Sequence, residues 1–216
     1  MSDTYRHRLE DQPLDFTVEK DERLYPGFRP LDSVTVHHAP LARPEGLTAR
    51  REILRSGHAA IVIPYDPARD EIVVIRQFRI GAALTSGKAA ALELPAGLVD
   101  EGEDALQAAR RELEEETGLV AQAIAPAYAI LSSPGLSDEI ASFFLALVDA
   151  ETLNGEGGKL DEQEDILAIR APVDALIEAV DAGSIENGFL VSAAHWFARH
   201  GRARARLLRD AAEPAA

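Results

Sequence analysis

The stretch that decides the fold is GLVDEGEDALQAARRELEEETGL, residues 97–119. Its middle has the marks of a helix, because Asp104 can cap the first turn and Gln107 follows three residues later, as in a capping box. Gly118 suits the position just after a helix, where the backbone often turns left-handed. We therefore predict a helix from about Asp104 to Thr117.

Glutamates crowd the C-terminal half of this predicted helix, where the helix dipole disfavours negative charge by about 0.3–1 kcal/mol per group. Glu112, Glu115 and Glu116 are spaced by three and four residues and therefore share one face. A cation would relieve their repulsion, and an oxygen-only cluster suits a hard divalent ion such as Mg²⁺ or Mn²⁺. The alternative is a solvated, charge-laced helix that holds no metal.

The whole stretch also follows one spaced pattern. Gly97 is followed by five residues, Glu103, seven residues and Arg111-Glu112, and the pattern ends in Glu115-Glu116, one residue and Gly118. This pattern resembles the box of the Nudix hydrolases at every specified position. The mixture of strands and outer helices suggests α+β or an α/β sandwich, and the resemblance implies an α/β/α sandwich with a mixed sheet. It also implies cleavage of a nucleoside diphosphate linked to another group, with Mg²⁺ as cofactor and Mn²⁺ as the alternative.

The same resemblance implies roles for particular residues. The structural positions of the box are Gly97, Glu103, Arg111 and Gly118, with Glu103 bracing Arg111. The implied metal ligands are the backbone carbonyl of Ala96 and the side chains of Glu112, Glu116 and Glu164. The implied catalytic carboxylates are Glu115 and Glu162. Of these, Glu162 in the acidic loop LDEQEDI is the expected general base.

Outside the box, the chain resembles the ADP-ribose pyrophosphatase branch of that family nearly from end to end. The marker of this branch is a proline about fifteen residues past the box, and Pro134 stands fifteen residues after Leu119. The resemblance places Arg79 at the diphosphate, and Arg51 with Glu52 at the adenine end. The implied substrate-binding residues are Phe28, Arg29, Arg51, Glu52, Arg79, Leu98, Ser133, Pro134, Gly135 and Glu139.

Two other functions remain open at this stage. A hydrolase of GDP-mannose or another nucleotide sugar would share the fold and the N-terminal extension. A sensor that binds ADP-ribose without turnover belongs to a different class; such regulators usually have a degraded box and an attached DNA-binding module. The box here is intact and no basic helix-turn-helix segment is visible, which favours an enzyme.

The composition of the chain excludes several classes of partner and site. The 216 residues carry a net charge of −15, which argues against a nucleic-acid backbone as ligand. The chain has no Cys, which excludes disulfides and thiol catalysis and fits a reducing cytoplasm. There is no apolar run of about 18 residues, so we expect no membrane span. The expected ligand is a small molecule resembling ADP-ribose.

We predict three regions: a β-rich segment over residues 1–55, a hydrolase domain over 56–205 and a flexible tail over 206–216. In the hydrolase domain, HAAIVIPYDPARDEIVVIRQFRIG reads as a hairpin of two apolar strands around the turn DPARD. Two amphipathic helices are expected near the C-terminus, over about 173–182 and 186–200.

The first 55 residues are too extended and too often broken by proline to form a core of their own. Apolar residues such as Leu24 and Val34 therefore need another surface to cover them. The resemblance points to a homodimer with exchanged N-terminal segments, in which Phe28 of one chain stacks on the adenine bound at the other.

Overall fold

A computed structural model describes residues 9–159 and 163–212. The chain divides into two compact units. One holds the described residues up to Gly57 together with Ser133–Glu139, and the other holds His58–Ser132 and the described residues from Ile140 onward. The N-terminal unit thus takes one short segment from the middle of the sequence.

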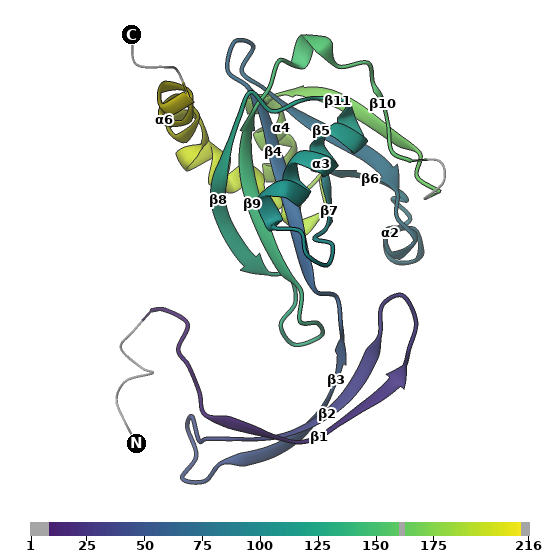
Figure 1. Ribbon diagram of the computed structural model, residues 1–216, viewed down its shortest axis with the longest axis vertical. Coiled ribbons are helices and arrows are strands. Elements are labelled where there is room, and N and C mark those ends of the chain that lie inside the picture. Colours follow the sequence, from purple (N-terminus) through teal and green to yellow (C-terminus); the bar gives the residue numbers. More distant parts are fainter. Residues whose placement is uncertain (1–8, 160–162, 213–216) are drawn as a thin grey trace. The chain divides into compact units, whose positions relative to one another are not determined.

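The larger unit is built on a mixed sheet, shown in Figure 1. Its strand order is β10 (Glu156–Gly157), β11 (Ile166–Pro172), β5 (Glu71–Phe78), β4 (His58–Asp66), β9 (Ile140–Leu147) and β8 (Ala123–Leu131). Two short strands join the sides of this path: β6 (Ala90–Glu93) pairs with β5, and β7 (Ala96–Leu98) pairs with β4. The sheet is mixed because β4 and β9 run parallel while the other pairs are antiparallel.

The predicted hairpin forms only at its closed end. β4 and β5 are paired at Tyr65 with Ile72 and at Asp66 with Glu71. Over the rest of its length β4 pairs with β9 and β7, and β5 pairs with β11 and β6. Adjacent strands in sequence therefore separate, because each has a more extensive partner elsewhere in the chain.

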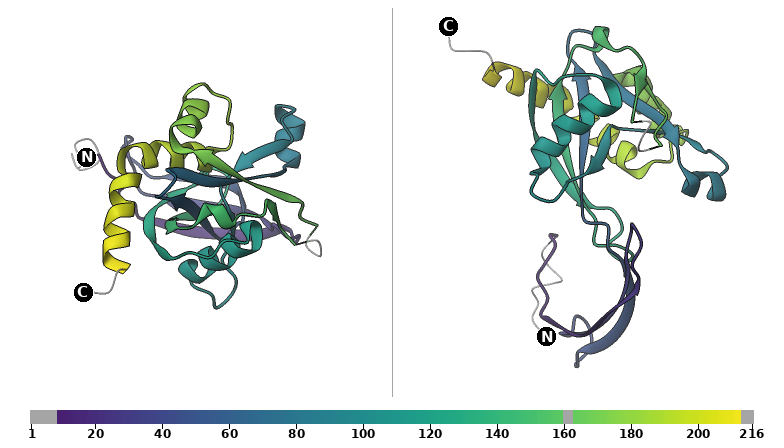
Figure 2. Two further views of the ribbon diagram at one scale, coloured as in Figure 1. Left: turned by 90° about the horizontal axis from the view of Figure 1, so that it is seen from above. Right: turned by 45° about the vertical axis from the view of Figure 1, so that its right-hand side comes forward.

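Alternate residues of β4 face two different cores, as the twofold periodicity of a strand requires. Ala60 and Val62 pack with α3 (Ala105–Thr117), and Ile61, Ile63 and Tyr65 pack with the C-terminal helices. Those helices are α4 (Val173–Asp181), α5 (Gly188–Trp196) and α6 (Arg202–Ala212). Helices therefore cover both faces of the sheet, as Figure 2 shows, and the predicted α/β/α sandwich is confirmed.

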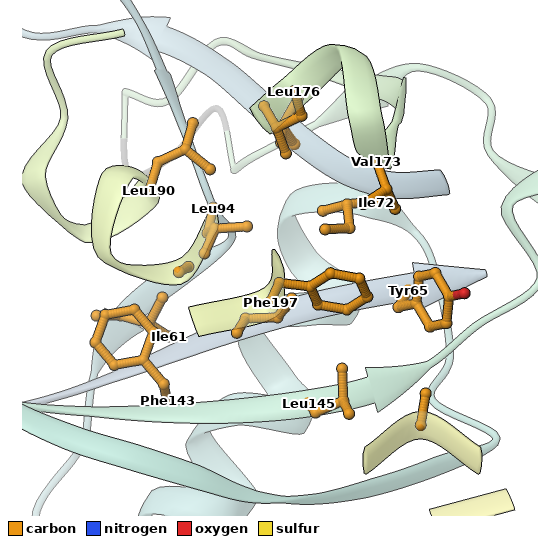
Figure 3. Packing of buried hydrophobic residues seen from close by; sticks show 14 of the residues in the cluster. Ile61, Tyr65, Ile72, Leu94, Phe143, Leu145, Val173, Leu176, Leu190 and Phe197 are labelled. Carbon is orange, nitrogen blue, oxygen red and sulfur yellow. The ribbon is translucent and has the colours of Figure 1, made fainter. Parts of the chain in front are cut away.

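The core on the α4 and α5 side is large and aromatic at its centre (Figure 3). Phe197 packs against Tyr65, with ring centroids 4.8 Å apart, and Phe143 stacks on Tyr128 at 4.4 Å. This core fixes α5 against the sheet, and so fixes Asn187, the residue that caps α5.

The segment expected to be a flexible tail from residue 206 is helical as far as Ala212. α6 is anchored because Ala205 is buried and Leu208 packs against the same core. At its start, Arg202 donates to Asp70 and Asp174 at 2.7 Å. None of the helices in the described ranges is long and apolar enough to cross a bilayer.

The N-terminal unit is a three-stranded antiparallel sheet of β1 (Phe16–Tyr25), β2 (Leu31–His38) and β3 (Leu47–Leu54). Every residue of β1 is exposed, including Phe16, Val18 and Leu24. The buried residues of the three-stranded sheet include Asp32 and Ser33 on β2, and both are polar. Ion pairs of Asp32 therefore contribute to the stability of this sheet.

Candidate functional site

The helix α3 begins and ends where the sequence predicts. Asp104 accepts hydrogen bonds from the backbone N–H groups of Leu106 and Gln107, and the Gln107 side chain accepts from Asp104 N, which completes the capping box. Gly118 closes the helix at φ 70°, a left-handed conformation that glycine adopts without strain. The acidic turn is therefore held at a defined place against β4 and β7.

Glu116 is the most deeply buried carboxyl on this helix, with 2% of its surface exposed. Its Oε2 accepts the backbone N–H of Ala96 at 2.8 Å. Burial raises the pKa of Glu116 to about 8, and the charges of Glu112 and Glu164 add to the rise. A carboxyl buried near like charges is a place where a cation is strongly favoured.

Arg111 connects the loop before the helix to the acidic turn. Its guanidinium donates to both carboxylate oxygens of Glu103, at 3.1 and 3.0 Å, and to the carbonyl of Leu98 at 3.0 Å. The same group reaches Glu112 at 2.5 Å and Glu115 at 3.3 Å. The structure thus brings Glu103 and Arg111 together. The guanidinium of Arg111 holds the loop before the helix and the acidic turn in contact with each other.

Two glycines allow the backbone to approach the acidic turn closely. A Cβ added at Gly97 would lie 1.9 Å from Oε1 of Glu112. A Cβ at Gly157 would lie 1.9 Å from the backbone oxygen of Glu116. A side chain at Gly157 would therefore require the backbone to move, and one at Gly97 would require the Glu112 carboxylate to turn away.

The glycine-rich loop after β10 is attached to the end of α3. Gly158 N donates to the backbone oxygen of Glu115 at 3.0 Å, and the Lys159 ammonium pairs with the Glu115 carboxylate at 2.7 Å. Glu164 is half-buried, and its N–H donates to the carbonyl of Lys159 at 3.1 Å. Glu162, the predicted general base, lies outside the described residues.

Arg79 stands where β5 ends and α2 (Ile80–Thr85) begins. Its guanidinium makes a two-pronged ion pair with the buried carboxylate of Glu93, at 2.8–3.1 Å, and Glu93 also accepts from the Asn187 amide at 3.0 Å. Burial lowers the pKa of Arg79, but Glu93 and the charges of Glu116 and Glu164 outweigh this and leave the pKa raised. Arg79 is therefore electrostatically coupled to the acidic face of α3.

A cavity of about 1130 Å³ lies beside Arg79, between α2, β6, α4 and α5. Glu93 and Asn187 line it with Arg79. Sequence reasoning did not single out these two residues. The detectable sign was a lone carboxylate, Glu93, in the apolar strand AALEL.

The remaining candidate residues lie in the N-terminal unit. Phe28 is 86% exposed, and the guanidinium carbon of Arg29 lies 5.3 Å from its ring centroid. Arg51 and Glu52 are exposed neighbours on β3. The other four, Ser133, Pro134, Gly135 and Glu139, belong to the segment that joins this unit from the middle of the chain.

The acidic face has the type of ligand that a divalent cation prefers, but its carboxylates are not arranged around one point. Across residues 9–159 and 163–212, no three carboxylate or imidazole groups converge as a ready metal site. Arg111 and Lys159 instead neutralise Glu112 and Glu115, while Glu116 stays buried with one N–H donor. The donor set is oxygen only, which suits Mg²⁺ or Mn²⁺.

Comparison with known proteins agrees with this geometry. The family model described as NUDIX domain matches residues 55–187. The chain belongs to the Nudix family. As a member of a family of hydrolases that generally depend on a divalent metal, it is an enzyme.

Several curated Nudix relatives span nearly the whole chain. The ADP-ribose pyrophosphatase of Escherichia coli (strain K12) is 39% identical over 189 residues, which cover 88% of this chain and 90% of that protein. The ADP-ribose pyrophosphatase of Haemophilus influenzae is 32% identical, covering 84% and 85%. A GDP-mannose pyrophosphatase of Enterobacter sp. (strain 638) is also 32% identical, covering 81% and 91%.

A solved structure described as an ADP compounds hydrolase has the same fold. Its TM-score is 0.69 at 20% identity, covering 91% of this chain and all of the other. At this identity the likeness supports the architecture.

Proposed function

We propose that this Nudix hydrolase cleaves the diphosphate of ADP-ribose to give AMP and ribose 5-phosphate. The observation that carries the proposal is the buried Glu116 beside Ala96, on an acidic helix face coupled to the diphosphate-binding candidate Arg79. The identity of 39% to an ADP-ribose pyrophosphatase over most of both chains supports this substrate.

The proposed cofactor is Mg²⁺, held by Glu112, Glu116, Glu164 and the carbonyl of Ala96. When bound, the ion would screen the negative charge of the diphosphate and stabilise the leaving phosphate. The oxygen-only donor set and the raised pKa of Glu116 support this assignment.

Arg79 would orient the diphosphate through its planar guanidinium, which matches phosphate oxygens in a two-pronged arrangement. Glu93 already holds that guanidinium in one orientation, so less side-chain entropy is lost on binding. Glu162 would accept the proton of the attacking water, and Glu115 would act with it as a second carboxylate.

The nucleoside end of the substrate would be recognised by the exposed Phe28, by Arg29, and by Arg51 with Glu52. Ser133, Pro134, Gly135 and Glu139 would complete this recognition, with Leu98 from the hydrolase domain. An exposed aromatic ring is suited to stacking on adenine, and a guanidinium beside the ring is available to the ribose or phosphate.

The decisive experiment is product analysis by ion-exchange chromatography. ADP-ribose, GDP-mannose, NADH and diadenosine polyphosphates are each incubated with the protein, with and without Mg²⁺. We expect AMP from ADP-ribose at the highest kcat/KM, and only with metal. Faster release of GMP from GDP-mannose would favour the second candidate, which the GDP-mannose pyrophosphatase relatives at 31–32% identity support. Binding of ADP-ribose without products would indicate a sensor.

We also propose that the protein is a homodimer with exchanged N-terminal segments, because β1 leaves large apolar side chains uncovered. Co-expression of Phe28→Ala with Glu116→Gln tests this. Random pairing gives about half mixed dimers, in which one site is intact, so about a quarter of all sites should regain activity. Activity no better than the average of the two parents would overturn the exchange.

A further inference from the structure

Arg55, directly after β3, is the point where three parts of the N-terminal unit meet. Its Nε donates to Asp32 on β2 at 2.8 Å, and its Nη2 donates to Asp21 on β1 at 3.0 Å. Its Nη1 donates to Asp138 at 3.2 Å, in the segment contributed from the middle of the chain. One guanidinium therefore links two strands of the sheet to a segment that is remote in sequence.

Asp32 is the centre of this arrangement, since it is only 4% exposed. A buried carboxylate must be paired to remain charged. Arg23 and Arg55 both donate to it, and together they hold the pKa of Asp32 below its usual value. The buried carboxylate of Asp32 therefore holds one side of the Arg55 guanidinium in place.

The segment Ser133–Glu139 is attached to the end of β3 by its backbone as well. Leu54 N donates to the carbonyl of Leu136 at 2.9 Å, and Asp138 N donates to the carbonyl of Leu54 at 3.3 Å. The other oxygen of the Asp138 carboxylate accepts Ser56 N at 2.8 Å. Asp138 therefore serves two partners, a backbone N–H and the Arg55 guanidinium.

Both sides of this junction carry candidate nucleotide-binding residues. The β1–β2 turn holds Phe28 and Arg29, and Arg29 Nη1 donates to the carbonyl of Ser56, the residue next to Arg55. Arg55 N itself donates to the carbonyl of Pro30 in the same turn. The segment on the other side of Arg55 carries Ser133–Gly135 and Glu139.

We propose that Arg55 is a positioning residue for nucleotide recognition. It fixes the segment Ser133–Glu139 to the N-terminal sheet, so that the β1–β2 turn and this segment form one rigid recognition element. The inference rests on the proposed function for its kinetic consequence, but the attachment itself is a property of the N-terminal unit alone. Arg suits this role because its rigid planar group carries donors on three separate nitrogen atoms, so that each nitrogen can serve a different carboxylate, whereas a lysine ammonium is a single point charge.

Arg55→Gln, Asp138→Asn and the double variant test the inference. Asn at 138 can still accept Ser56 N, but it turns an N–H₂ group towards the Arg55 donors. We expect KM for ADP-ribose to rise about fivefold in Arg55→Gln, with kcat within about twofold, because the lost alignment weakens binding without touching the reacting atoms. Asp138→Asn should raise KM in the same way. The double variant should be no worse than Arg55→Gln, since the link between Arg55 and Asp138 is already lost in Arg55→Gln.

Arg23→Gln is the matched control, because Arg23 also donates to Asp32 but is not bonded to Asp138. Amide hydrogen exchange supplies a readout that needs no turnover. The N–H groups of Leu54 and Asp138 should exchange about tenfold faster in Arg55→Gln and Asp138→Asn, and should change little in Arg23→Gln.

The results distinguish a specific link between Arg55 and Asp138 from general loosening of the sheet. An equal rise in KM for Arg23→Gln, or additive effects in the double variant, would show general loosening of the sheet and overturn the inference. Unchanged exchange at Leu54 and Asp138 in Arg55→Gln would overturn it as well. If the wild type shows no turnover of ADP-ribose, the proposed function fails, and the exchange data still decide whether Arg55 holds the segment.

Discussion

Substituting Glu116 by Gln should stabilise the metal-free protein at neutral pH, although it removes a metal-ligand candidate. Burial raises the pKa of Glu116 from a usual 4.5 to about 8. A raised carboxyl pKa means that the folded chain holds its proton more tightly than the unfolded chain. The stability contribution of this proton is therefore intact below about pH 4.5 and is lost progressively as the pH rises towards 8.

The size of the effect follows from that window. Each pH unit between the two pKa values costs about 1.4 kcal/mol, so the penalty grows by roughly 2–3 kcal/mol between pH 5 and pH 7. Gln carries no charge and can still accept the N–H of Ala96, so it avoids this penalty. For a chain of this length the gain corresponds to about 5–10 °C in Tm at pH 7 and about 2 °C at pH 5.

The assay is thermal unfolding by circular dichroism in excess EDTA, from pH 5 to pH 8, for wild type and Glu116→Gln. Glu114→Gln is the matched control, since Glu114 is exposed on the same helix and its neutralisation should not give this pH dependence. Added Mg²⁺ should then raise the Tm of the wild type more than that of Glu116→Gln. A Tm difference between the two proteins that stays constant from pH 5 to pH 8 would refute the reasoning.

Three further changes probe the site. Gly157→Ala would place a Cβ 1.9 Å from the backbone at the end of α3, so the following loop should be displaced and kcat should fall by about tenfold or more. Gly81→Ala is the control, because its Cβ would meet no atom within 4 Å, and its kcat in the same steady-state assay should be nearly unchanged. Glu162→Gln should lower kcat by about 10²–10⁴-fold with little change in Mg²⁺ affinity by calorimetry, and a loss below threefold would place the base elsewhere. Glu93→Gln should free Arg79 and raise KM for ADP-ribose, whereas an unchanged KM would show that Arg79 needs no anchor.

Local sequence signals predicted what is local in this structure. The limits of α3 could be read from Asp104, Gln107 and Gly118, because capping depends on residues within one turn. The spacing of Glu112, Glu115 and Glu116 predicted a shared acidic face. It did not predict that Glu116 is buried, because burial depends on β7 and on β10 at Gly157, which come from other parts of the chain.

Strand partners and ion-pair partners were beyond local reasoning for the same reason. The hairpin expected around Asp66 separates because β4 finds β9, a partner that no short window contains. The tail expected from residue 206 is helical because Arg202 meets Asp70, far away in sequence. Glu93 and Asn187 could not be linked to Arg79 before the sheet and α5 were placed.

The parallel pairing of β4 with β9 also sets the order in which the chain can be completed during synthesis. His58 pairs with Ile140 on β9, and Leu54 at the end of β3 pairs with Ser137, so β4 and β3 both leave the ribosome well before these two partners exist. At a translation rate of about 5–20 residues per second, the delay is on the order of 4–16 s. Until β9 emerges, Ile61, Val62 and Ile63, fully buried in the finished protein, lack the strand with which β4 pairs over most of its length. Before β9 is synthesised, the apolar side chains of β4 are therefore the part of the nascent chain that a chaperone would most need to cover.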